Sequence, residues 1–274
     1  MYSKKIQVVV LLTLLWGCTK NENPHEVLLG TLWMQTSAEY QMITKQAYEL
    51  AKIKLMDGLE NSDWTAALEQ TSNYAQLPPA IILDLDETVL NNSAYQARLA
   101  KENKSYDEDT WNQWVKEEKA TLVPGALDFV KFALAQHVSV FYATNRTHDV
   151  EEATKNNLVK LGFPLNDQQD WILTKNEKEN WGSDKTTRRN FLAQSHRIIL
   201  LFGDDLNDFV SGAKVSLETR VELANKYKNY WGEKWITIPN PLYGSWEAAL
   251  YEFDYSHSKE QKIQKKMNRL NTLK

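Results

Sequence analysis

The sequence predicts an α/β domain in which a parallel sheet is flanked by helices and carries a small, mostly helical insert. Apolar runs of strand length alternate with segments of helical periodicity, which is typical of a parallel sheet with crossover helices. Acidic side chains directly follow two of these runs. The chain has 274 residues, 42% hydrophobic and 25% charged, so one domain with a sizeable core is expected. The net charge of −4 argues against nucleic acid as the main partner.

The first residues have the layout of a secretory signal. Lys4 and Lys5 precede an apolar run, residues 8–16, that is too short to span a membrane as a stable anchor. Cys18 follows in a context that resembles a bacterial lipobox, in which the cysteine is lipidated. We therefore expect a lipoprotein signal peptide over residues 1–17; the alternative is an ordinary signal peptide with an incidental cysteine. Cys18 is the only cysteine, which excludes a disulfide framework.

A polar tether, residues 18–26, leads into the expected folded domain, residues 27–274. Residues 27–59 have helical periodicity and no proline, and the pair Asp57-Gly58 is expected to end that helix. The first strand follows two prolines and occupies residues 80–83. Its continuous apolar run is typical of a strand that is buried on both faces.

The later elements continue this alternation. Further strands are expected at residues 138–144, 170–175, 197–203 and 235–241, with helices over residues 122–137, 148–163 and 185–196. Residues 88–122, rich in Lys, Glu, Trp and Tyr, interrupt the pattern after the first strand. Such an insert lies over the carboxyl ends of the strands, where open α/β sheets bind ligands. The basic tail, residues 258–274, is interpreted as a solvated helix in preference to a membrane or partner contact.

Two groups of acidic residues mark the candidate site. Asp84 and Asp86 follow the first strand, and Asp204 and Asp208 follow the strand at residues 197–203. The ends of neighbouring parallel strands meet at one edge of the sheet, so these carboxylates are expected close together. Oxygen ligands at this density suit Mg²⁺. The alternative role, helix capping, explains Asp208 alone but not both groups.

Polar and cationic residues follow the neighbouring elements. The strand at residues 138–144 ends in Thr144, Asn145 and Arg146, and Lys185 begins the helix before the next acidic group. A hydroxyl, an amide and cations around a carboxylate–metal centre form a site for a transferring phosphoryl group, because electrostatic positioning does most of the work in that reaction.

These motifs resemble a known superfamily. The four-motif pattern of the haloacid dehalogenase superfamily consists of D-x-D-x-T, a Thr at the next strand end, a Lys and G-D-x-x-x-D. More narrowly, "ILDLDETVLNNSAY" with "GDDLNDF" resembles the class C acid phosphatases, which are bacterial outer-membrane lipoproteins of about this length. "WMQTSAEY", "SDKTTRR" and "PNPLYGSWE" are similar to that family too. The resemblance covers most of the mature chain and implies a Rossmann-like core.

The resemblance also implies a role for each site residue. Asp84 is the expected nucleophile, which forms an aspartyl-phosphate, and Asp86 the general acid and base. Mg²⁺ is expected on the Asp84 carboxylate, the Asp86 carbonyl and Asp204. The remaining roles are phosphate binding by Thr144, Asn145 and Lys185, and positioning of Lys185 or a metal-bound water by Asp208.

The function implied is that of a Mg²⁺-dependent phosphomonoesterase, an acid phosphatase at the bacterial outer membrane, facing the periplasm or the cell surface. Expected substrates are small phosphate esters, nucleoside 5′-monophosphates or nicotinamide mononucleotide, with Tyr95 and Tyr243 against the substrate's ring. Relatives suggest a homodimer, and the lipid on Cys18 provides the membrane contact. Two alternatives stay open: a phosphotransferase that uses the same intermediate, and a catalytically silent surface-binding lipoprotein.

Overall fold

The structure is a computed structural model that describes residues 25–165 and 169–273. The expected signal peptide and Cys18 lie outside the described residues. Within the described part of the chain, no helix has both the length and the apolar character needed to cross a membrane.

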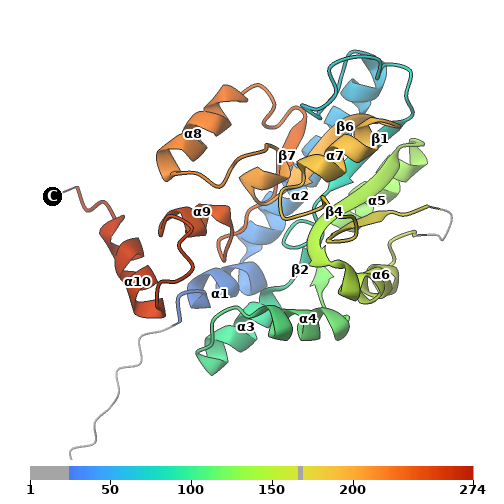
Figure 1. Cartoon of the computed structure of the whole chain (residues 1–274). Coiled ribbons are helices and arrows are strands. Elements are labelled where there is room, and N and C mark those ends of the chain that lie inside the picture. Colours follow the sequence, from blue (N-terminus) through green and yellow to red (C-terminus); the bar gives the residue numbers. More distant parts are fainter. Residues whose placement is uncertain (1–24, 166–168, 274) are drawn as a thin grey trace, which may run out of the picture.

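A five-stranded parallel sheet forms the centre of the molecule and confirms the predicted α/β fold (Figure 1). Its strand order is β5-β4-β1-β6-β7. The strands are β1 (Pro79–Leu83), β4 (Ser139–Thr147), β5 (Ile172–Lys175), β6 (Arg197–Gly203) and β7 (Trp235–Thr237). Strand β1 pairs with β4 on one side and with β6 on the other. This central position brings the end of β1 next to the ends of β4 and β6.

Helices cover both faces of the sheet, so alternate residues of β1 enter two different cores. Ile81 and Leu83 belong to one core, which includes Phe129 of α5. Ala80 and Ile82 belong to the other. The helices on the first face are α2 (Ala38–Glu60), α5 (Ala126–Ala135) and α6 (Glu151–Lys160), and α7 (Thr186–Ala193) contributes to the second face. A strand buried on both faces explains the continuous apolar sequence of β1.

The long helix expected over residues 27–59 is in fact two helices, α1 (Leu28–Thr36) and α2. Ser37 adopts an extended conformation between them and caps α2, because its side chain accepts a hydrogen bond from the Tyr40 amide at 3.1 Å. The prediction that Asp57-Gly58 ends the helix is also wrong, since α2 continues to Glu60. A Cβ at Gly58 would come within 2.6 Å of Ile199, so this glycine permits close packing of α2 on β6.

The insert after β1 is built on a two-stranded antiparallel ribbon of β2 (Leu90–Asn91) and β3 (Thr121–Leu122). Between these strands lie α3 (Ser93–Glu102) and α4 (Glu108–Lys116). Trp111 and Trp114 are both buried on α4, as expected from their spacing.

Several shorter elements complete the chain. The helix expected over residues 148–163 begins as a 3₁₀ turn, η1 (His148–Val150), and continues as α6. A second 3₁₀ turn, η2 (Leu206–Asp208), follows β6. Two helices, α8 (Leu217–Lys226) and α9 (Ser245–Ala249), were not expected, and the basic tail forms α10 (Lys259–Asn268).

Candidate active site

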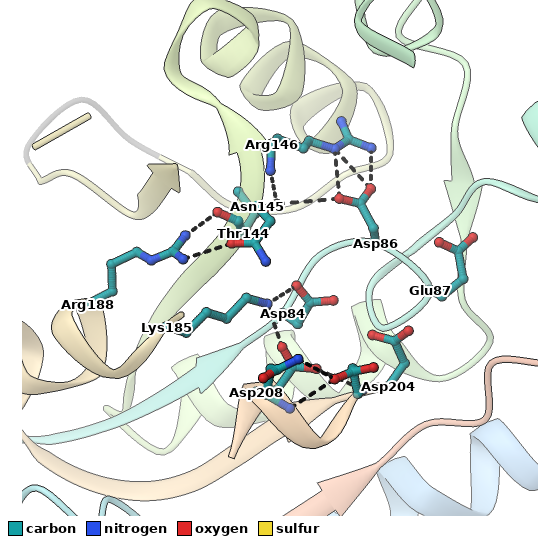
Figure 2. Close-up of polar contacts among 12 residues, drawn as sticks. Asp84, Asp86, Glu87, Thr144, Asn145, Arg146, Lys185, Arg188, Asp204 and Asp208 are labelled. Carbon is teal, nitrogen blue, oxygen red and sulfur yellow. Dashed lines mark hydrogen bonds and ion pairs between the residues drawn. The ribbon is translucent and has the colours of Figure 1, made fainter. Parts of the chain in front are cut away.

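Three carboxylates meet at the carboxyl end of the sheet (Figure 2). Asp84 directly follows β1 and Asp204 directly follows the neighbouring strand β6, while Asp208 ends η2. One carboxylate oxygen of each lies within 4.8 Å of the others. The strand order therefore brings together acidic residues that are about 120 positions apart in the sequence, as the motif positions predicted.

Lys185 lies among these carboxylates and is 4% exposed. Its Nζ forms ion pairs with Asp84 Oδ1 and, at 2.6 Å, with Asp208 Oδ1. The other oxygen of Asp208 accepts a hydrogen bond from the Asp205 amide at 2.9 Å. Because both Asp208 oxygens are engaged, this residue is suited to positioning Lys185 rather than to taking part in bond making.

The electrostatics of the cluster are suited to binding a cation. Burial raises the pKa of Asp84 to about 7 against the opposing effect of Lys185, and burial with the Asp84 charge raises the pKa of Asp204 well above its usual value. Three carboxylates near one lysine thus carry excess negative charge once they ionise. A bound cation removes this penalty, since an opposite charge favours the ionised form.

The oxygen atoms of the cluster fit a hard divalent metal ion. One Asp204 oxygen accepts a hydrogen bond from Asn240 at 2.7 Å, and one Asp84 oxygen is paired with Lys185, which leaves the second oxygen of each carboxylate. The Asp86 backbone carbonyl accepts no hydrogen bond from the residues that the structure describes. Carboxylate and carbonyl oxygens of this kind are the donors that hard divalent ions such as Mg²⁺ prefer.

Asp86 lies on the other side of Asp84 and is held by Arg146. Arg146 Nε and Nη2 donate to Asp86 Oδ1 at 3.0 and 2.8 Å, and the Asn92 side-chain amide donates to the same oxygen at 3.0 Å. We expected Arg146 among the cations around the phosphoryl group. The structure places Arg146 in the cavity lining, where its buried guanidinium pairs with Asp86 and orients the proposed general acid.

The end of β4 is fixed by an arginine that the sequence analysis did not identify. Arg188 of α7 is buried, and its guanidinium donates to the Thr144 carbonyl and, at 2.8 Å, to Asn145 Oδ1. The Thr144 hydroxyl is 3.4 Å from Asp86 Oδ2. Arg188 lies one helical turn after Lys185 in "SDKTTRR", and this i, i+3 spacing is the signal that it faces the same site.

Glu87, next to Asp86, is fully buried with a positive φ of 60°. Its carboxyl accepts hydrogen bonds from the Tyr243 hydroxyl and, at 2.8 Å, from the Asn92 amide. Burial and the nearby Asp86 charge raise the pKa of Glu87 to about 8. Glu87 therefore anchors Tyr243 at the wall of the site.

The two tyrosines predicted to contact substrate differ in position. Tyr243 lines the cavity, as expected. Tyr95 is 2% exposed, with its ring edge-on to Trp111 at a centroid distance of 5.2 Å and its hydroxyl 3.0 Å from Thr110 Oγ1. It is not among the cavity-lining residues of the described chain. The structure thus gives Tyr95 a packing role inside the insert, because its ring completes the aromatic face of α4.

A cavity of about 900 Å³ connects this cluster to the surface. Its inner end is formed by the site residues Asp84, Asp86, Asn145, Lys185, Asp204 and Asp208. His148 lies outside its lining and pairs with Glu151 at 2.8 Å. The cavity has room for a phosphate ester with a substantial organic group.

Comparisons with known proteins agree with this geometry. A family model described as HAD superfamily, subfamily IIIB (Acid phosphatase), matches residues 18–246. The structure of the class C acid phosphatase from Bacillus anthracis has a TM-score of 0.77 and 34% sequence identity, covering 89% of this chain and 96% of that chain. The same enzyme with tungstate bound has a TM-score of 0.79 at the same identity and coverage.

Two plant proteins are more distant relatives. The stem 28 kDa glycoprotein of Glycine max is 23% identical over 74% of this chain and 77% of its own length. Acid phosphatase 1 of Solanum lycopersicum is 26% identical over 59% of this chain and 57% of its own length.

Proposed function

Because this chain belongs to the acid phosphatases of subfamily IIIB of the HAD superfamily, and is thus a phosphomonoesterase, we propose that it hydrolyses small phosphate esters through an aspartyl-phosphate on Asp84, with Mg²⁺ as cofactor. The observation that carries the proposal is the buried contact of Lys185 with both Asp84 and Asp208. It presents a carboxylate and a cation together at the inner end of the cavity.

The positions of the side chains support the following reaction. An Asp84 carboxylate oxygen attacks phosphorus, and the bond from phosphorus to the alcohol oxygen breaks while Asp86 gives its proton to that oxygen. Water then attacks the phosphorus, Asp86 takes a proton from it, and phosphate leaves as Asp84 is regenerated. Lys185 and the Asn145 amide, which both line the cavity, stabilise the charge on the phosphoryl oxygens.

The metal ion would be held by the Asp84 carboxylate, the Asp86 carbonyl and Asp204. When bound, it would offset the repulsion between the attacking carboxylate and the phosphate. Arg146 holds Asp86 in one orientation through two N–H groups, so the same carboxyl group can serve as acid in the first step and as base in the second.

The proposed substrates are nucleoside 5′-monophosphates or nicotinamide mononucleotide. Support comes from the size of the cavity and from the aromatic side chains of Tyr106, Tyr243 and Trp246 in its wall. Aromatic rings stack on flat bases without strong preference among them. Several nucleotides should therefore be accepted with similar efficiency.

The test is a panel of phosphate esters assayed for phosphate release, with and without EDTA. We expect hydrolysis of nucleotides, its loss on chelation and its return with Mg²⁺. Full activity after exhaustive chelation, with the metal content measured by elemental analysis, would rule out the cofactor. Absence of phosphate release from every ester would rule out the function.

We also propose that the mature protein is a lipoprotein of the outer membrane, anchored through Cys18. The support is the sequence of residues 1–18 and its resemblance to a lipobox. The Cys18→Ser variant should appear in the soluble fraction after cell fractionation, with the phosphatase activity of the wild type. Retention of the variant in membranes would contradict the anchor. A homodimer stays a prediction, which light scattering on the purified protein can test.

A further inference from the structure

The outer wall of the active-site cavity includes three segments that are far apart in the sequence: residues 25–27, the tip of the insert at residues 105–106, and helix α10. Lys266 of α10 pairs with Glu26, and Lys259 of α10 donates to Asn103 Oδ1 at 2.6 Å. The picture agrees, since α10 lies beside α1 at the end of the molecule that also carries α3 (Figure 1). Helix α10 follows the segment matched by the family model, which ends at residue 246.

The lysines of α10 are arranged on the cavity side of the helix. Lys259, Lys262 and Lys266 have the spacing i, i+3 and i+7, which places them on one face, and all three line the cavity. The fourth lysine of the helix, Lys265, is outside the cavity lining and pairs with Glu252 at 3.2 Å. The basic sequence of this tail predicted a solvated helix. The structure shows that its positive face is directed toward the active site.

Two of these charges are not balanced by an acid. Lys266 is neutralised by Glu26 and, at 2.5 Å, by Glu247. Lys259 and Lys262 form no ion pair with any residue that the structure describes. Lys262 lies 5.1 Å from the centre of the Tyr251 ring, a contact that leaves its charge available to an anion.

The cavity is therefore polarised along its length. Its inner end carries Asp84, Asp86 and Asp204, and its outer wall carries the unpaired cations of Lys259 and Lys262. A phosphate ester with one anionic group places that group at the inner end. The outer wall offers apolar side chains such as Trp246, Leu250 and Tyr251 to an uncharged tail, and its unpaired lysines also complement a second negative charge.

We propose that Lys259 and Lys262 form a subsite for a second anionic group, a phosphate, phosphonate or carboxylate, carried by the substrate at the end remote from the phosphate that is cleaved. The inference rests on the proposed function and adds a preference among small phosphate esters: phosphomonoesters with a distal anionic group are preferred over matched esters without one. Lysine suits this role because its flexible stem carries a point charge that adapts to groups at different distances.

The experiment uses the full-length protein and two substrate series of equal chain length. One series is the ω-phosphonoalkyl phosphates, whose phosphonate carries charge but cannot be hydrolysed; the other is the ω-hydroxyalkyl phosphates. The measured quantity is the ratio of their kcat/KM values as a function of chain length. We expect the wild type to prefer the phosphonate by roughly threefold to tenfold at the best length, mainly through KM, because two partly exposed ion pairs contribute modestly. The preference should weaken at high salt.

Three variants decide the assignment. The double variant Lys259→Gln/Lys262→Gln should bring the ratio toward one, Lys262→Arg should retain a preference, and Lys265→Gln on the same helix should keep the wild-type ratio. A wild-type ratio near one at every chain length, or a preference that survives the double variant, overturns the subsite.

A binding measurement separates this proposal from the proposed function. Calorimetry with alkane-α,ω-diphosphonates requires no turnover. If the wild type binds the diphosphonate and the double variant binds it more weakly, the subsite is supported even if no ester is hydrolysed. If the enzyme hydrolyses both series equally and binds the diphosphonate no better than an alkylphosphonate, the subsite is overturned and the phosphatase function is retained.

Discussion

Lys185 and Lys262 line the same cavity in very different environments. Lys185 is buried, 4% exposed, and contacts two carboxylates, Asp84 and Asp208. Lys262 lies at the outer wall, over the Tyr251 ring and without a carboxylate partner among the described residues. The first lysine is fixed by two carboxylates, and the second is half-buried with its ammonium over a tyrosine ring.

The difference between the two environments indicates where a change in the position of a charge affects catalysis most. Charges in a buried, preorganised cluster interact strongly because little water screens them, so one altered atom disturbs the whole inner end. Charges at the outer wall are screened by salt and water and contribute far less each. Substitutions at the inner end should therefore have much larger effects on turnover than substitutions farther out.

Asp84→Asn is expected to have the largest effect. The change is nearly isosteric, but an amide does not attack phosphorus, so we expect kcat for phosphate release to fall by roughly 10³-fold or more. Circular dichroism should show a retained fold. Turnover within tenfold of the wild type, in protein whose sequence has been verified, rejects Asp84 as the nucleophile.

Asp86→Asn tests the residue that Arg146 orients. A nitrophenolate leaves almost without protonation, whereas a ribose alkoxide needs a proton, so the loss should depend on the substrate. We expect kcat to fall by about 10²-fold or more for a nucleoside 5′-monophosphate and by much less for nitrophenyl phosphate. Equal losses on both substrates argue against Asp86 as the general acid.

Tyr243→Ala tests a residue at the wall of the cavity, farther out than the carboxylate cluster. Loss of a stacked ring is expected to lower kcat/KM for adenosine 5′-monophosphate on the order of tenfold. Glycerol 3-phosphate has no ring, so its kcat/KM should change little. If both values fall together, the hydroxyl contact with Glu87 matters more than stacking, and the ring-binding role is excluded.

Glu87→Gln should have the smallest effect at neutral pH, because the pKa of about 8 keeps this buried carboxyl largely protonated there. Because its pKa is raised, Glu87 of the folded, metal-free protein keeps its proton between about pH 4.5 and pH 8. In the unfolded chain, where its pKa is about 4.5, Glu87 has lost the proton over this range. The free energy of unfolding of the wild type should thus fall, relative to the variant, by about 1 kcal/mol per pH unit between pH 6 and 8. If the free energies of unfolding of the wild type and the variant differ by the same amount at every pH, the raised pKa of Glu87 is contradicted.

Much of the fold and of the inner site was predictable from local sequence. The apolar runs that became β1 and β6 are continuous because both strands are buried on two faces, and acids that follow neighbouring parallel strands meet by topology. The positions of Asp84 and Asp204 follow from that rule. The split between α1 and α2 was missed, because a single extended Ser37 leaves the surrounding helical periodicity intact.

The sequence by itself determined the five strands of the sheet, the helices α5, α6 and α7, the acidic residues at the strand ends and the chemistry that those side chains support. Only the tertiary structure decided that Arg146 holds Asp86, sixty residues away, that Tyr95 packs inside the insert, and that α10 directs its lysines into the cavity. The physical reason is the range of the interactions. Strand and helix patterns depend on the burial of nearby residues, whereas these partners are chosen by the packing of elements that are distant in the chain.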